Sequence, residues 1–113
     1  MKALAGQSLD GEFGLITNDG DIQLASHALK AMAHPLRLKI LCILGGTSEV
    51  AVQDIVDRVG TSQSNISQHL SILRDKNIIA ARKDANKVYY RVADARILQL
   101  ISSMRSAFCS RSP

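Results

Sequence analysis

Two short helical stretches joined by a three-residue turn with one glycine constrain the fold more than any other feature of this chain. The first stretch runs from Glu49 to Val59, and apolar side chains recur along it at helical spacing. Gly60 then makes a turn, and Ser62 is a good N-cap for a second helix from Gln63 to about Lys76. The pattern therefore predicts two helices joined by a tight turn.

A β-hairpin is predicted to follow the second of these helices. Residues 78–83 and 87–92 have the composition of strands, and they flank a loop at Asp84-Ala85-Asn86. A helix, a glycine turn, a capped helix and a basic hairpin, in this order, are the layout of a winged helix-turn-helix. The sequence thus predicts a mainly α fold with a β-hairpin wing.

Three further helices are expected around this unit. The first runs from Asp21 to about Ala33. The next begins at Pro35, which loses no hydrogen bond at the first helical position, and it stops at Gly45-Gly46. Asp94 can cap a last helix, whose apolar side chains continue as far as Phe108.

The length of 113 residues predicts one domain. Residues 1–20 contain four glycines and little periodicity, so we expect a flexible N-terminal arm ahead of a winged helix-turn-helix domain over residues 21–113. No stretch approaches the roughly 18 apolar residues that span a bilayer, and no secretion signal is visible. We therefore expect a soluble, cytoplasmic protein with no membrane partner.

Positive charge is concentrated in the predicted capped helix and hairpin. Residues 62–91 hold six basic and two acidic residues, so this segment accounts for the whole formal charge of +4. A localised basic surface suits the phosphates of nucleic acid, although a merely solvated face is the alternative. Joined to the helix-turn-helix pattern, the charge favours binding to double-stranded DNA.

The candidate DNA contacts lie on the outer face of the capped helix and on the hairpin. Side-chain amides and hydroxyls can read base edges in the major groove, and the basic side chains can contact phosphates. His69 has a second interpretation, as a packed histidine. The candidates are Ser62, Gln63, Ser64, Asn65, Ser67, Gln68, His69, Ser71, Arg74, Arg82, Lys83, Lys87 and Arg91.

Three segments resemble the ArsR/SmtB family of bacterial repressors. They are His34-Pro35-Leu36-Arg37-Leu38-Lys39-Ile40-Leu41, Ser62-Gln63-Ser64-Asn65-Ile66-Ser67-Gln68-His69-Leu70-Ser71-Ile72-Leu73-Arg74 and Val88-Tyr89-Tyr90-Arg91-Val92. The likeness extends from about residue 21 to 109. It implies a winged-helix repressor that forms a homodimer through its first and last helices and binds a palindromic operator.

Metal sensing, which many members of this family perform, is not expected here. Ala51 and Gln53 occupy the positions where one family site has thiolates. A second family site needs an Asp-x-His pattern on the last helix, but Asp94-Ala95-Arg96 has no imidazole. We therefore expect no metal and no cofactor.

The two cysteines, Cys42 and Cys109, resemble those of the branch that responds to oxidants and persulfides. This resemblance implies that oxidants or reactive sulfur species link the two thiols within one protomer, by a disulfide or polysulfide bridge, and that the link weakens operator binding. A direct disulfide needs Cα atoms within roughly 7 Å. The alternative is that Cys42 is a small core residue and Cys109 an incidental thiol.

Two other functions remain open from the residues alone. The protein could be a repressor that responds to a metal or small molecule and has structural cysteines, or it could be a protein-interaction module. An enzyme is not expected, because no carboxylate pair, nucleophile–base pattern or phosphate-binding glycine loop is visible.

Overall fold

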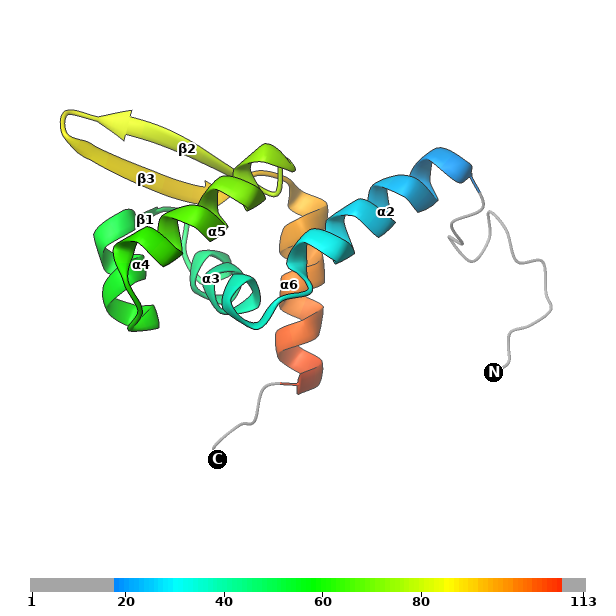
Figure 1. The fold of residues 1–113 in the computed structure, drawn as a ribbon. Coiled ribbons are helices and arrows are strands. Elements are labelled where there is room, and N and C mark those ends of the chain that lie inside the picture. The colour runs from blue at the N-terminus through cyan, green and yellow to red at the C-terminus, as the bar shows by residue number, and fades with distance from the viewer. Residues whose placement is uncertain (1–17, 109–113) are drawn as a thin grey trace.

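The computed structural model describes residues 18–108 of the chain. The helices are α2 (Asp19–Met32), α3 (Pro35–Gly45), α4 (Val52–Val59), α5 (Gln63–Asp75) and α6 (Ala95–Phe108), and the strands are β1 (Val50–Ala51), β2 (Ile79–Asp84) and β3 (Lys87–Val92). The β2–β3 hairpin projects from one end of the body, and α2 extends from the other (Figure 1). The predicted mainly α fold with a β-hairpin wing is confirmed.

The tight turn between α4 and α5 forms as predicted. Gly60 ends α4 with a φ of 82°, in the left-handed region that glycine adopts without strain. The Ser62 hydroxyl then accepts a hydrogen bond of 3.1 Å from the backbone amide of Asn65. The cap that the sequence indicated therefore sets the first residue of α5.

Two predicted helix starts are wrong. The first helix begins at Asp19 and not at Asp21, because Asn18 caps it by accepting hydrogen bonds from the amides of Gly20 and Asp21. Residues 18–20 of the predicted arm therefore belong to the cap and first turn of this helix, and an arm over residues 1–17, which lie outside the described part of the chain, stays a prediction. The third helix begins at Val52, and not at Glu49.

Two residues that were predicted to begin the third helix belong to the sheet. Val50 and Ala51 form β1 and pair with Tyr90 and Tyr89 of β3. Pairing in the sheet satisfies their backbone groups, which outweighs the helical periodicity of the local sequence. The strand order is β1–β3–β2, with both pairings antiparallel.

The predicted hairpin is correct to within one residue. β2 covers residues 79–84, where the prediction was 78–83, and β3 covers the predicted 87–92. The loop is consequently the pair Ala85 and Asn86. Ala85 has a φ of 57°, so this turn holds a non-glycine residue in the left-handed region.

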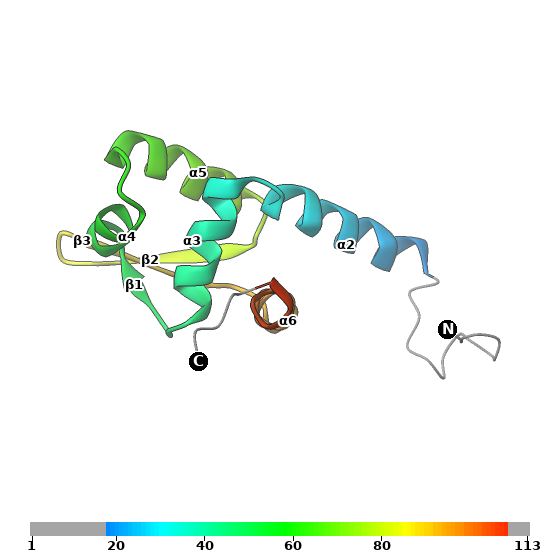
Figure 2. The same ribbon diagram turned by 90° about the horizontal axis from the view of Figure 1, so that it is seen from below.

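The α3 helix is the centre of the core. Its residues Ile40, Leu41 and Leu44 are almost fully buried, and Figure 2 shows α3 between α5 and α6. Gly45, at the end of α3, permits a close approach of α6, since a Cβ atom there would lie only 2.8 Å from Cγ2 of Ile101. Because Gly45 has no side chain, α3 and α6 can approach each other this closely.

The predicted cap of α6 is present. The Asp94 carboxylate accepts a hydrogen bond of 2.8 Å from the backbone amide of Arg96 and a second, of 2.7 Å, from its guanidinium. These hydrogen bonds lower the pKa of Asp94 to about 2. The carboxylate therefore stays ionised, and keeps capping α6, well into the acidic range.

No helix within residues 18–108 is long and apolar enough to cross a membrane.

Candidate nucleic-acid interface

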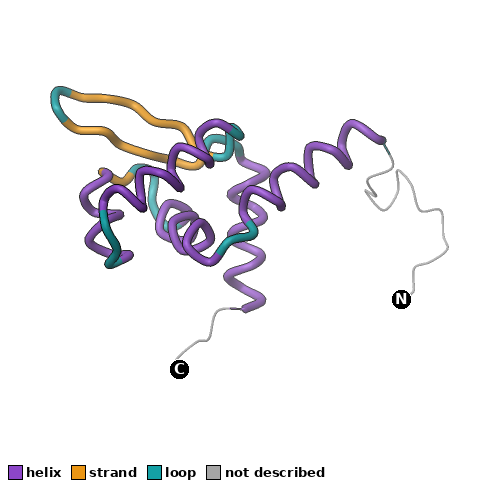
Figure 3. The backbone as a smooth tube through the Cα atoms, in the orientation of Figure 1, coloured by secondary structure: helices purple, strands orange, loops and turns teal. Residues whose placement is uncertain are grey.

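The outer face of α5 is polar and accessible. Figure 3 shows α5 running from the short loop after α4 to the loop that leads into the hairpin. Its core side carries the predicted apolar stripe, now observed as the buried residues Ile66, Leu70 and Leu73. Five of the predicted DNA contacts are exposed along this helix, namely Gln63, Ser64, Ser67, Gln68 and Arg74.

Two predicted contacts lie at the edges of that face. Asn65 and Ser71 are half-buried, and the Asn65 amide donates a hydrogen bond of 3.3 Å to the hydroxyl of Thr61. Asn65 therefore holds the turn before α5 as well as flanking the exposed face. The hydroxyls and amides of the outer face can both donate to and accept from base edges.

The N-terminus of α5 is suited to a phosphate. The first turn of a helix has free amides and a partial positive charge, and no acidic residue occurs in α5 before Asp75. Ser62 satisfies one of these amides and is itself exposed.

Substitutions of Ser62 should separate the stability of α5 from its binding to DNA. We expect Ser62→Ala to destabilise the domain by about 1 kcal/mol, because an N-cap is lost. Ser62→Asp keeps a capping oxygen and should retain the melting temperature, but its negative charge faces phosphate and should weaken operator binding. Thermal denaturation and fluorescence anisotropy measure the two effects, and wild-type affinity in the aspartate variant would show that this terminus is remote from DNA.

His69 lies against α3, where its ring has partners within the protein. It is half-buried, its Nδ1 atom lies 3.4 Å from Nη1 of Arg37, and its ring centroid is 4.6 Å from that of His34. The structure thus shows the packing that was the second interpretation of this residue. Contact of His69 with DNA stays a prediction.

Arg82, predicted to contact DNA from the wing, has an ionic partner. Its guanidinium donates two hydrogen bonds to the Glu49 carboxylate, at 2.6 and 2.9 Å, and lies 4.8 Å from the centre of the Tyr89 ring. The hydrogen bond from Arg82 lowers the pKa of Glu49. Arg82 therefore ties the hairpin to the residue just before β1.

The register of the hairpin places the other three basic side chains on its two opposite faces. Arg82 pairs directly with Tyr89, so that residues of even number on β2 share a face with Lys87 and Arg91 of β3. Lys83 pairs with Val88 and lies on the opposite face. Lys83, Lys87 and Arg91 are exposed, and none of them forms a salt bridge with another described residue.

The sequence interpretation missed Glu49 and Arg37, which hold the two parts of this surface in place. Glu49 was assigned to a helix, and its partner is 33 residues away in the chain. Arg37 and Lys39 are the two charged residues of the otherwise apolar stretch from Leu36 to Leu44. A charge in an apolar stretch is a signal, but it does not identify the partner.

Cys42 is half-buried on α3, beside the C-terminal part of α6. It lines a hollow of about 560 Å³ together with Leu38, Met104, Arg105 and Phe108. Cys109, the other predicted redox residue, lies outside the described residues, directly after Phe108. Cys42 forms no disulfide with any residue of the described range.

Two positions at which the sequence lacks the thiolates of a family metal site have structural roles here. Ala51 lies in β1, and the Gln53 amide donates a hydrogen bond of 3.0 Å to Asp57. No group of three or more His, Cys, Asp or Glu residues comes together within the described range. That the protein binds no metal ion stays a prediction.

A helix-turn-helix with an exposed polar second helix and a basic hairpin defines a winged-helix DNA-binding protein. A family model described as bacterial regulatory protein, arsR family, matches residues 34–81. The HTH-type transcriptional regulator YgaV of Escherichia coli (strain K12) is 34% identical over 85 residues, which cover 75% of this chain and 86% of that protein. The chain belongs to the ArsR family and is a DNA-binding transcriptional regulator, not an enzyme.

Two further similarities support this assignment. The biofilm growth-associated repressor of Xylella fastidiosa (strain Temecula1 / ATCC 700964) is 30% identical over 86 residues, covering 76% of this chain and 75% of that protein. The structure of HlyU from Vibrio cholerae N16961 matches with a TM-score of 0.79 and 33% sequence identity, covering 82% of this chain and all of that one. The predicted winged helix-turn-helix is confirmed.

Proposed function

We propose that the protein is a repressor that binds a palindromic operator as a homodimer when reduced, and that linking Cys42 to Cys109 by a disulfide or polysulfide bridge releases it. The observation that carries this proposal is the accessible Cys42 beside the end of α6, whose last described residue immediately precedes Cys109. Two relatives give it support by name: one is a repressor, and one solved structure is described as reduced HlyU.

The link is chemically simple when the inducer is a peroxide. The thiolate of one cysteine attacks a peroxide oxygen, which gives a sulfenic acid and, from hydrogen peroxide, one water molecule. The second thiol attacks the sulfenic sulfur, a disulfide forms, and a second water leaves. The two thiols thus lose two protons and two electrons, and the peroxide is reduced to two water molecules.

A bridge between Cys42 and Cys109 would change how α6, a proposed pairing helix, is oriented relative to α3, against which the recognition helix α5 packs. Cys42 lies on α3, the helix against which α5 packs, and Cys109 follows α6. The two recognition helices of a dimer must lie roughly 34 Å apart to enter successive major grooves. A link that rotates α6 against α3 would change this separation.

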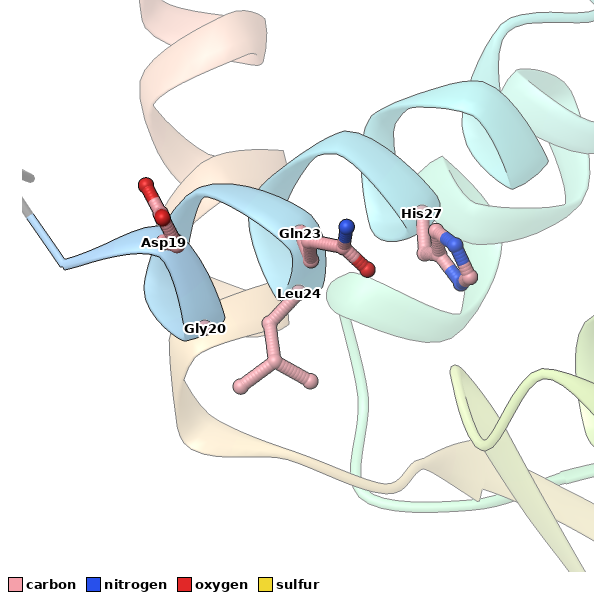
Figure 4. A pocket seen from close by; sticks show the side chains of 5 residues that line it. All are labelled: Asp19, Gly20, Gln23, Leu24 and His27. Carbon is pink, nitrogen blue, oxygen red and sulfur yellow. The ribbon is translucent and has the colours of Figure 1, made fainter.

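We propose α2 and α6 as the surfaces that pair in the dimer. Six large apolar side chains are exposed on these two helices: Ile22, Leu24, Leu29, Leu98, Leu100 and Phe108. Figure 4 shows Leu24 projecting from α2 beside Gln23 and His27, and the shallow hollow there is lined by α2 alone. A second copy of the chain, related by twofold symmetry, would cover this apolar surface.

Operator binding measured with and without oxidant tests the thiol mechanism. We expect peroxide or polysulfide to weaken binding of the reduced protein at least tenfold, and to leave Cys42→Ser and Cys109→Ser at their starting affinity. Intact mass should show the loss of two hydrogens, or the gain of bridging sulfur, in the wild type only. If oxidant releases the Cys42→Ser protein from the operator, the thiol link is wrong. The proposal that the protein binds DNA would be unaffected by that result.

A further inference from the structure

One guanidinium contacts two helices besides its own. Arg37 lies in the first turn of α3, and its Nε atom donates a hydrogen bond of 2.6 Å to the carbonyl of Ala31, in the last turn of α2. Its Nη1 atom lies 3.4 Å from Nδ1 of His69, on α5. The side chain is partly buried at this junction.

His34 makes a second connection between α3 and α5. Its Nδ1 atom accepts a hydrogen bond of 3.1 Å from the amide of Leu36 and so caps α3. Its ring lies against that of His69, with the ring planes inclined by 42°. Arg37, His34 and His69 therefore make the polar contacts at the junction of α2, α3 and α5.

The hydrogen bond to Arg37 requires a neutral His69. Arginine is only a donor, so Nδ1 of His69 must provide a lone pair, and the single ring proton must reside on Nε2. Protonation of Nδ1 removes this acceptor and places a cation beside a guanidinium. The hydrogen bond between Arg37 and His69 thus forms in one protonation state of the histidine and is lost in the other.

The surroundings of His69 favour the neutral state. Burial lowers its pKa, and the charges of His34 and Arg37 lower it further. The group that α2 contributes to the junction is the carbonyl of Ala31, which does not titrate. No carboxylate within residues 18–108 pairs with His69.

We infer that Arg37 is a positioning residue for operator binding: it holds the recognition helix α5 at a fixed angle to α2 through neutral His69. The inference rests on the proposed pairing of protomers through α2, since α2 then determines where each α5 stands in the dimer. Loss of the junction leaves α5 folded, because its core stripe is unaffected, but lets its direction vary relative to the partner's α5.

The pH profile of operator binding tests this inference on the reduced, full-length protein. As the pH falls through the pKa of His69, which lies below the usual 6.5, the hydrogen bond between Arg37 and His69 is lost. We expect operator affinity to fall there by at least about fivefold, the lower end of typical coupling between sites. A histidine that binds phosphate directly would give the opposite sign, with affinity rising as the pH falls.

Variants at both ends of the hydrogen bond separate positioning from folding. His69→Gln offers Arg37 an oxygen acceptor that does not titrate, so we expect its operator affinity, whatever its value near neutral pH, not to fall in acid. Arg37→Met should bind about fivefold more weakly at neutral pH and also lose the fall. His27→Gln, at an exposed histidine on the proposed pairing surface of α2, should keep the fall in acid, and loss of the fall in this variant would place the titrating group on that surface and overturn the inference.

Two further measurements keep the outcome unambiguous. Nitrogen NMR shifts of the His69 ring should show the proton on Nε2 in the wild type, and a proton on Nδ1 would overturn the inference. Sedimentation at each pH monitors the dimer. Dissociation in acid would implicate the pairing surface, whereas an intact dimer whose wild-type and His69→Gln pH profiles are identical would contradict the role of Arg37.

Discussion

The double variant Ser64→Glu/Gln68→Glu is expected to lose operator binding by at least about a hundredfold while remaining folded. The two residues are exposed and lie one turn apart on the outer face of α5. Each removed base contact costs about 1–3 kcal/mol, and about 1.4 kcal/mol corresponds to a factor of ten. The two introduced carboxylates would also repel the phosphates of DNA, and this repulsion opposes binding to any DNA sequence.

Fluorescence anisotropy on operator DNA at fixed salt measures this loss. Thr47→Glu/Ser48→Glu is the matched control, because it adds the same charge in the exposed segment between α3 and β1, which lies away from α5 (Figure 2). Circular dichroism should give wild-type melting for both variants. Wild-type affinity of the α5 variant would mean that another surface binds the operator.

The second large effect is expected at the proposed pairing surface. In Leu24→Glu/Leu98→Glu, both substituted side chains are exposed in the single chain, at 57% and 41%, so the protomer should keep its fold. Burial of one leucine contributes about 1.5–3 kcal/mol, and twofold symmetry makes each substitution act twice. We therefore expect a monomer.

The monomer should also bind the operator far more weakly. A dimer binds its second half-site at high effective concentration, which raises affinity by about 10²–10⁴. Sedimentation equilibrium gives the mass, and anisotropy gives the affinity. The Thr47→Glu/Ser48→Glu protein should remain dimeric, and a dimeric Leu24→Glu/Leu98→Glu protein would place the pairing surface elsewhere.

Local chemistry was enough to predict most of the elements. A cap and a left-handed glycine act within a few residues, so Gly60 and Ser62 define the turn and the start of α5. The buried stripe of α5 follows from helical periodicity alone. The same local reasoning failed at Val50 and Ala51, which pair with a strand almost forty residues later.

The sequence by itself thus determined the order of the described helices and of the hairpin, and the polar outer face of α5. Only the tertiary structure decided that Arg82 is paired with Glu49, that His69 contacts Arg37, and that Cys42 is accessible beside α6. The physical reason is distance along the chain. Caps and periodicity depend on neighbouring residues, whereas these pairings join residues more than thirty positions apart, and only the packing of the core brings them together.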